Sequence, residues 1–398
     1  MLSIKTLDQL PLSGKRVLLR VDYNIPRNTD GTITDDRRIR ETLPTLFYLL
    51  NKNASVILIA HLADPDQPEE KYSLKHVVPR LGALLGKKVR FFTDCIGMEV
   101  KKACQQIQPG EVFLLENVRF HPEEKANSLH FAQSFVELAD FFLLDAFASA
   151  HRDHASIVQL PKLFKGKCGG GFLLEREMRF LSEHLLSPKR PFIAIIGGSK
   201  VSSKIGIVEK LLEKCDHLAI VGAMAFTFLK AKGHAIGNSL YEPEFLEKAR
   251  VLLKRAQQQG KQILLPVDVL VSDALDAPRL LRTVEMSTGI DSGSYGVDIG
   301  EKTIGDIYNL VQPAKTLFWN GPAGIFEIPE FSYGTKALAN IFASHPHITA
   351  VGGGDSCAAL KMCQVEDKID HISTGGGACL ELIEKETVSG IRALEENI

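Results

Sequence analysis

The sequence has no long apolar run and few features of a secreted protein. No stretch approaches the ~20 consecutive apolar residues that a membrane-spanning helix needs. The first residues, MLSIKTLDQLPLSGKR, lack the apolar core of a secretory signal. The seven cysteines are scattered without any CxxC spacing, which disfavours both a disulfide framework and a zinc ribbon. We therefore expect a cytoplasmic protein with reduced thiols and no membrane association.

An excess of charge and two common nucleotide-binding signatures are also missing. The formal net charge is -1, so the overall charge does not indicate a nucleic-acid partner. No GxxxxGK[ST] motif is present, which excludes a P-loop protein. No complete GxGxxG motif is followed by an acidic residue at the expected spacing. A dinucleotide-dependent dehydrogenase is therefore disfavoured, and only fold analogy supports it.

What recurs along the chain is a short, β-branched, apolar run. The runs are VLLRV after Arg16, SVILIA at 55, EVFLLE at 111, FFLLDAF at 141, FIAII at 192, HLAIVG at 217, QILLPV at 262, KTLFWN at 315 and HITAVGG at 347. Such runs are typical of strands buried on both faces of a parallel sheet. Amphipathic stretches lie between many of them, for example at 201–215 and 241–259. This alternation predicts an α/β fold with doubly wound parallel sheets.

The length of the chain predicts two domains. A chain of 398 residues is too long for one ordinary core. The helical stretch FLLEREMRFLSEHL at 172–185 lies between the segment KGKCGGG, expected to be a loop, and the proline-containing SPKRP. We interpret residues 171–187 as a hinge helix between the domains.

Polar residues of the first half follow the apolar runs at the point where each strand should end. Asp22 and Asn24 follow the first run, His61 follows the second, Arg119 follows the third, and Arg152 follows the fourth. Ligands of open α/β sheets bind beyond the carboxyl ends of the strands. Because guanidinium groups bind phosphate and carboxylate in bidentate fashion, this pattern favours a small polyanion.

Glycines occupy the corresponding positions in the second half. They occur in IIGGSK at 195, IVGAMA at 220, WNGPAGIFE at 319, VGGGDS at 351 and STGGGAC at 373. Glycine at a strand-to-helix turn lets backbone N–H groups approach phosphate oxygens. The five runs together indicate a nucleotide-phosphate site. Asp355, after the triple glycine, is either a magnesium ligand or a helix N-cap, or both.

Several long strings, all in one order, resemble the phosphoglycerate kinase family. They are RVDYNIP at 20, LLENVRFH at 114, DAFASAHRDHAS at 145, GGSKVSSKI at 197, WNGPAGIFE at 319, GGGDS at 352 and STGGGACLEL at 373. The resemblance runs from about Leu7 to the C-terminus. It implies two Rossmann-like domains joined by a hinge helix: a 3-phosphoglycerate-binding domain over 1–170, the hinge over 171–187, a nucleotide-binding domain over 188–378, and a segment over 379–398 that packs back on the first domain. It also implies transfer of a phosphoryl group between 1,3-bisphosphoglycerate and ADP in glycolysis, in line and after hinge closure, by a monomer.

Individual residues take their expected roles from matching motifs. The resemblance implies a substrate site formed by Asp22, Asn24, Arg38, His61, Arg119 and Arg152. It implies catalytic roles for Arg38, Lys200, Gly354 and Gly376. It implies nucleotide binding, as Mg-ATP or Mg-ADP, by Gly198, Lys204, Gly222, Asn320, Glu327, Gly353, Gly354, Asp355 and Ser356, with Mg²⁺ held by Asp355 and the nucleotide phosphates. No general base is expected, because the acceptor carboxylate is already ionised at pH 7.

One departure from the family pattern falls in the expected substrate loop. The family usually reads HLGRP after the second strand, and this chain reads HLADP, with Ala63 for glycine and Asp64 for arginine. We expect a rebuilt loop in which Arg38, Arg119 and Arg152 suffice for binding. The alternative is a catalytically weak family member that acts as a binding or structural protein. Milder departures are Ala148, Ser149, Ser203, Val221 and Glu301.

Overall fold

The computed structural model describes residues 4–28, 31–276 and 280–397 and divides into two compact units. The first unit comprises the chain up to Arg179 and the residues from Thr387 onward. The second unit is Phe180–Glu386, so the division falls within helix α7 (Phe172–Leu181). The C-terminal helix α15 (Ser389–Glu395) belongs to the first unit, where the Gly390 N–H donates to the Ala150 carbonyl at 2.7 Å.

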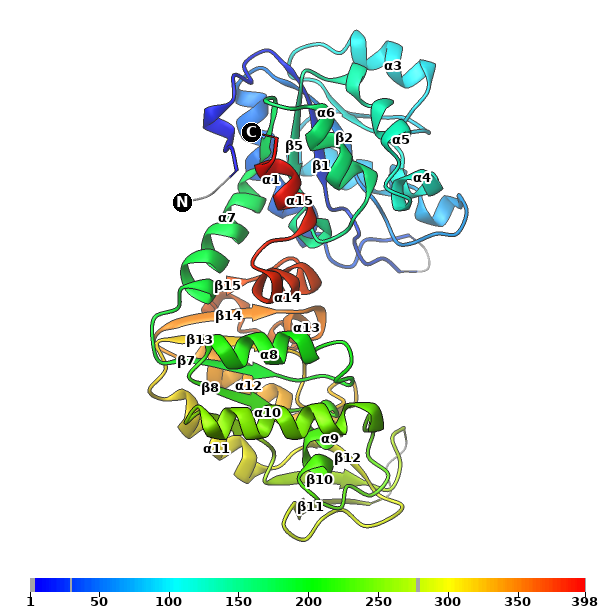
Figure 1. Ribbon diagram of the computed structural model, residues 1–398. Helices are drawn as coiled ribbons and strands as arrows, with labels where there is room; N and C mark the ends of the chain where they lie inside the picture. Colours follow the sequence, from blue (N-terminus) through cyan, green and yellow to red (C-terminus); the bar gives the residue numbers. More distant parts are fainter. Residues whose placement is uncertain (1–3, 29–30, 277–279, 398) are drawn as a thin grey trace. The chain divides into compact units, whose positions relative to one another are not determined.

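The first unit is built on a six-stranded parallel sheet with the order β3-β4-β2-β1-β5-β6 (Figure 1). Its strands are β1 (Arg16–Val21), β2 (Ser55–Ile59), β3 (Val89–Phe91), β4 (Val112–Leu114), β5 (Phe141–Asp145) and β6 (Cys168–Gly170). Leu19 on the central strand β1 pairs with Leu58 and with Leu143, and all three side chains are fully buried. Burial of both faces explains the continuous apolar runs.

The second unit repeats this plan with the strand order β15-β14-β13-β7-β8-β9. Its strands are β7 (Phe192–Ile196), β8 (His217–Ile220), β9 (Gln262–Leu264), β13 (Thr316–Asn320), β14 (Ile348–Gly352) and β15 (His371–Ile372). Figure 1 shows α8 and α10 in front of this sheet and α12 behind it. Trp319 is fully buried against Phe342 of α12, with ring centroids 5.6 Å apart. Two doubly wound parallel-sheet α/β units confirm the predicted fold class.

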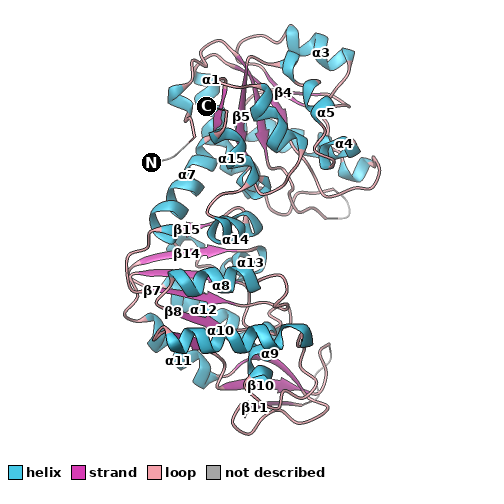
Figure 2. Ribbon diagram, viewed as in Figure 1, coloured by secondary structure: helices cyan, strands magenta, loops and turns pink. Residues whose placement is uncertain are grey.

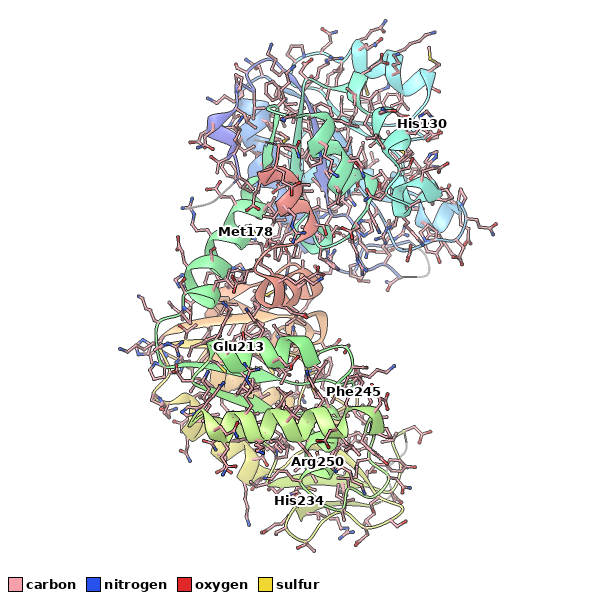
Figure 3. The ribbon with its side chains drawn as sticks, in the orientation of Figure 1. His130, Met178, Glu213, His234, Phe245 and Arg250 are labelled. Atoms are coloured by element: carbon pink, nitrogen blue, oxygen red, sulfur yellow. The ribbon has the colours of Figure 1, made fainter. Side chains whose placement is uncertain are left out.

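Helices connect the strands in both units (Figure 2). Those of the first unit are α1 (Arg37–Asn51), α2 (Val78–Leu85), α3 (Met98–Gln105), α4 (Pro122–Lys125), α5 (Leu129–Gln133), α6 (Leu160–Leu163) and α15, with α7 at the division. Those of the second are α8 (Ile205–Lys214), α9 (Met224–Ala231), α10 (Leu246–Gln258), α11 (Glu301–Val311), α12 (Tyr333–Ala343), α13 (Gly354–Met362) and α14 (Gly376–Lys385). The amphipathic stretches predicted as helices contain α8 and α10. Figure 3 labels Glu213 on α8 and Arg250 on α10.

Two features differ from the sequence expectations. The segment KGKCGGG, expected to be a loop, contributes edge strand β6, because Phe142 to Leu144 pair with Cys168 to Gly170. A three-stranded antiparallel sheet was not expected: it has the order β11-β10-β12 and consists of β10 (Asp268–Ser272), β11 (Leu281–Glu285) and β12 (Tyr295–Ile299). Its strand β11 buries only Val284, so it lacks the continuous apolar run that marked the other strands.

The connections create a switch point in each sheet. In the first unit β1 lies between β2 and β5, and in the second β7 lies between β8 and β13. Chains that leave a sheet in opposite directions open a crevice at the carboxyl ends of these central strands, where α/β proteins bind ligands. Among the described residues, no helix has both the length and the apolar character to cross a bilayer.

Candidate active site

In the first unit the candidate substrate residues surround the end of β1. Asp22 follows β1 directly, and its Oδ1 lies 2.6 Å from a terminal nitrogen of Arg38 in the first turn of α1. The Ser149 hydroxyl donates to Asp22 Oδ2 at 2.9 Å, and the Asn24 N–H donates to Oδ1 at 2.9 Å. Burial opposes the charge of Asp22, but Arg38, the Asn24 amide and Arg20 outweigh it and hold its pKa below the ordinary value. Asp22 therefore stays ionised and fixes the position of Arg38.

A buried hydrogen-bond network lies next to this site and holds His61 in place. Arg20 is fully buried, donates from Nε to Ser156 Oγ at 2.8 Å, and places a terminal nitrogen 3.2 Å from His61 Nδ1. Ser156 Oγ in turn donates to buried Glu124 at 2.5 Å. Burial lowers the pKa of His61 well below its ordinary value. Because arginine can only donate, His61 accepts at Nδ1 as a neutral ring with its proton on Nε2.

The sequence reasoning did not include Arg20 or Glu124 in the site. For Arg20 a signal was present, since it is the one charged residue of the otherwise apolar run VLLRV. A charge inside a buried strand requires a partner, and the partners belong to segments remote in sequence. For Glu124 the sequence carried no comparable signal.

The loop with Ala63 and Asp64 is held in place by three neighbours. The Ala63 N–H donates to Asn24 Oδ1 at 2.9 Å, and Arg119 donates to the Ala63 carbonyl at 2.7 Å. Lys125 Nζ lies 2.9 Å from Asp64 Oδ1. The φ of Ala63 is +58°, a left-handed conformation that favours glycine. Asp64 therefore has its own cation in this chain.

Arg152 is exposed, as is Asn24, whereas Asp22 and His61 are buried. Burial, and to a smaller extent repulsion from Arg152, lowers the pKa of Arg119. Arg119 itself is largely buried, with 11% of its side chain exposed. The five candidates Asp22, Asn24, Arg38, His61 and Arg119 thus lie in one connected neighbourhood, with Arg152 at its exposed margin.

In the second unit a cavity of about 460 Å³ opens at the carboxyl ends of the central strands. Apolar side chains that line it include Phe226, Leu240 and Ile325. Four predicted nucleotide-binding residues also line it, namely Gly198, Gly222, Glu327 and Asp355. A concave, mostly apolar pocket with a few convergent polar groups is typical of small-molecule sites.

Lys204 is the half-buried cation beside this cavity. Its Nζ donates to the Gly197 carbonyl at 2.6 Å. Burial lowers its pKa to about 8, and Asp355 acts in the opposite direction. A lysine with a lowered pKa near a carboxylate and beside a cavity is a candidate ligand for phosphate. Lys200, four residues earlier, is exposed, and its carbonyl accepts from the Ser203 hydroxyl at 3.1 Å.

The glycine turns of this unit approach one another so closely that side chains would collide. A Cβ on Gly222 would lie 2.6 Å from the Gly198 nitrogen. A Cβ on Gly376 would lie 2.6 Å from the Gly353 Cα. The approach of Gly376 to Gly353 brings together the starts of α13 and α14, and helix N-termini are places where anions bind. These two pairs therefore require glycine for steric reasons.

Side chains from β13 and α13 connect these turns. The Asn320 amide donates to the Gly352 carbonyl at 2.8 Å, and the Gly321 N–H donates to Ser356 Oγ at 2.7 Å. The N-cap of α13 is Gly353, so Asp355 is not the cap and the N-cap interpretation was wrong. Asp355 instead lies in the first turn of α13, where the helix dipole stabilises its negative charge.

Two doubly wound sheets, one with a cationic rim and the other with a glycine-rich cavity, are the arrangement expected of a phosphotransferase of the kinase class. A family model described as phosphoglycerate kinase matches residues 7–386. The chain therefore belongs to the phosphoglycerate kinase family. Its function is that of a kinase of glycolysis, which uses a nucleotide and small-molecule substrates.

Individual relatives agree with this family. The chain is 47% identical to a phosphoglycerate kinase of Chlamydia abortus, over 98% of each protein. It is 47% identical to a chloroplastic phosphoglycerate kinase of Volvox carteri, over 99% of this chain and 86% of the relative. A solved phosphoglycerate kinase of Coxiella burnetii matches with a TM-score of 0.88, 37% identity and 99% coverage of each chain. Nothing in these comparisons favours a binding or structural role.

Proposed function

We propose that this chain catalyses the reversible transfer of a phosphoryl group between 1,3-bisphosphoglycerate and ADP, giving 3-phosphoglycerate and ATP. The acceptor in the reverse direction is a carboxyl group. The main support for the proposal is that the two units contain different kinds of candidate binding site. One unit holds Arg38 against ionised Asp22 beside Arg119, and the other places Lys204 and glycine amides beside a cavity.

The first unit would bind the phosphoglycerate. Arg38 and Arg119 supply guanidinium groups, and Asp22 and Asn24 orient them and the neighbouring loop. Neutral His61 offers its Nε2 proton to a substrate oxygen, since Nδ1 already faces Arg20. Arg152, exposed at the margin, would add a further cation when substrate is present.

The second unit would bind the nucleotide. The base and ribose fit the apolar part of the cavity, with Glu327 and Gly222 in its lining. Lys204, Gly198 and the amides around Gly353, Gly354, Asn320 and Ser356 would face the phosphates. Asp355 fits a magnesium site, because a hard carboxylate ligand lines the cavity and nucleotide phosphates complete such a coordination shell. Mg²⁺ bound there would neutralise phosphate charge during transfer.

The chemistry itself asks little of the protein beyond placement and positive charge. The acceptor carboxylate is ionised at pH 7, so no side chain needs to remove a proton. Charge on the equatorial oxygens of the transferring group is stabilised by Lys200, Arg38 and the amides near Gly354 and Gly376. Water must be excluded, because acyl phosphates hydrolyse. Transfer requires that the reactants meet, and the hinge role of residues 171–187 stays a prediction.

Two further features are part of the proposal. The seven cysteines are all free, which supports the cytoplasmic location predicted from the sequence. A monomer is proposed because each unit contains a complete candidate half of the site in one chain. Analytical ultracentrifugation at micromolar concentration measures the second feature directly.

A coupled assay tests the proposed function. Purified protein is supplied with ATP, Mg²⁺ and 3-phosphoglycerate, and acyl phosphate formation is followed. We expect turnover with the wild type and a loss of about 10²–10³-fold in kcat for Lys200→Ala, the effect of one removed oxyanion donor, with much smaller changes in KM. Lys232→Ala, at an exposed lysine of the same unit, should be unaffected. Absence of turnover in the wild type would refute the function, and equal kcat in Lys200→Ala would remove Lys200 from the mechanism.

A further inference from the structure

Two cations of the first unit converge on one carboxylate oxygen. Lys125 Nζ lies 2.9 Å from Asp64 Oδ1, and a terminal nitrogen of Arg119 lies 3.9 Å from the same oxygen. Lys125 is the last residue of α4, and Arg119 belongs to the 3-10 helix Val118–Phe120 after β4. An anionic oxygen thus already occupies the place between these two cations.

This ion pair is accessible to solvent and therefore exchangeable. Asp64 has 61% of its side chain exposed and Lys125 has 44% exposed. Such pairs contribute little to stability because water screens them and ordering two side chains costs entropy. Arg119, in contrast, is mostly buried and held by the Ala63 carbonyl at 2.7 Å. The two cations can therefore stay in place while the carboxylate is exchanged for another anion.

A phosphate monoester is a stronger ligand for these cations than the resident carboxylate. Near pH 7 it carries a charge close to -2 and presents three acceptor oxygens, whereas Asp64 carries -1 and two oxygens. We propose that Lys125 binds the phosphate group of the phosphoglycerate together with Arg119, and that Asp64 is a resident counter-ion displaced by that phosphate. The inference rests on the proposed function of the first unit and adds to it a binding residue and a competing one.

The proposal predicts opposite effects for the two members of the pair. Loss of Lys125 removes a phosphate ligand, so KM for 3-phosphoglycerate should rise. Loss of the Asp64 charge removes a competitor and a repulsion, so KM should fall. If the pair served only to hold the loop, breaking it from either side would disturb the loop and shift KM in the same direction.

The experiment measures kcat and both KM values for Lys125→Ala, Lys125→Arg and Asp64→Asn. For Lys125→Ala we expect a rise of KM for 3-phosphoglycerate of about two- to fivefold, the upper part of the range for one solvent-screened ion pair. Asp64→Asn should lower it by a similar factor, and Lys125→Arg should stay near the wild type. The KM for ATP and kcat should change less than about twofold, because Lys125 acts in ground-state binding.

Matched controls separate this effect from general charge and folding effects. Lys75→Ala breaks an exposed pair of the same unit, with Lys75 Nζ 3.5 Å from Glu70, and should leave KM unchanged. Raising ionic strength should shrink the differences between variants, and thermal unfolding midpoints should show that each variant is folded. An unchanged KM in folded Lys125→Ala, or a rise of KM in Asp64→Asn, would overturn the proposal. Wild-type turnover tests the proposed function separately, so the two failures are distinguishable.

Discussion

Replacing Lys204 with methionine should stabilise the folded protein while it weakens nucleotide binding. Lys204 is partly buried, and burial lowers its pKa from 10.5 to about 8. At about 1.4 kcal/mol for each pKa unit, the charged lysine costs the folded state about 3 kcal/mol at pH 7. Methionine has a similar length and no charge, so this cost disappears.

Part of that gain is offset by a lost hydrogen bond. Lys204 Nζ donates to the Gly197 carbonyl at 2.6 Å, and methionine cannot. The net contribution of such a bond is about 1–1.5 kcal/mol. We therefore expect Lys204→Met to raise the free energy of unfolding by about 1–2 kcal/mol at pH 7. Nucleotide affinity should fall about 10–100-fold, the effect of losing a charge-assisted bond to phosphate.

The pH dependence gives this prediction its sharpest test. Between pH 8 and 10.5 the unfolded chain binds a proton at Lys204 that the folded protein has released, so wild-type stability rises with pH relative to the variant. The advantage of Lys204→Met should therefore shrink by about 2 kcal/mol between pH 7 and pH 9.5. Comparing the two proteins at each pH cancels the titration of other groups.

Urea unfolding at both pH values and calorimetric titration with ADP provide the measurements. Lys232→Met, at an exposed lysine of the same unit, is the control and should change neither quantity appreciably. The reasoning is wrong if Lys204→Met destabilises the protein at pH 7, or if its advantage is the same at both pH values. If Lys204→Met is more stable but binds ADP as tightly as the wild type, the electrostatic argument stands and Lys204 is not a nucleotide ligand.

Two backbone predictions concern alanine and glycine positions. Ala63→Gly should raise the free energy of unfolding by about 0.5 kcal/mol, because φ is +58° there. Ala126→Gly, at φ -73°, should lower the free energy of unfolding. Urea unfolding measures both changes, and a change of the same sign in both variants would contradict the argument. Gly376→Ala should destabilise the protein by about 1–3 kcal/mol, because the added Cβ would overlap Gly353. Gly354→Ala should not, because a Cβ added there would have no atom within 4 Å. Comparable losses of stability in the two variants would refute the steric explanation.

Much of the fold follows from local sequence patterns. Every continuous apolar run predicted as a strand contains one in the structure, for example FIAII as β7 (Phe192–Ile196). The reason is that strands buried on both faces need apolar residues at each position, which leaves a mark within a few residues. Strand β11 left no such mark because four of its five residues, all but Val284, are exposed.

Candidate site residues that belong to a recognisable motif were predicted from the sequence, and those whose roles depend only on tertiary contacts were missed. Asp22 and Lys204 belong to strings that match the family, so their numbers could be read from the sequence. Arg20 begins the matching string RVDYNIP but was assigned no role, and Lys125 lies outside every matching string. The role of Arg20 depends on its contact with His61, and that of Lys125 on its contact with Asp64 in the loop after β2.

The sequence by itself determined the two-sheet α/β plan, the family and most candidate ligands, because these depend on residue types at short spacing. Only the tertiary structure decided that Asp64 faces Lys125, that Asp22 remains ionised against Arg38, and that burial lowers the pKa of Lys204. Charge pairing and desolvation depend on distances between segments far apart in the chain, and no local pattern records those distances.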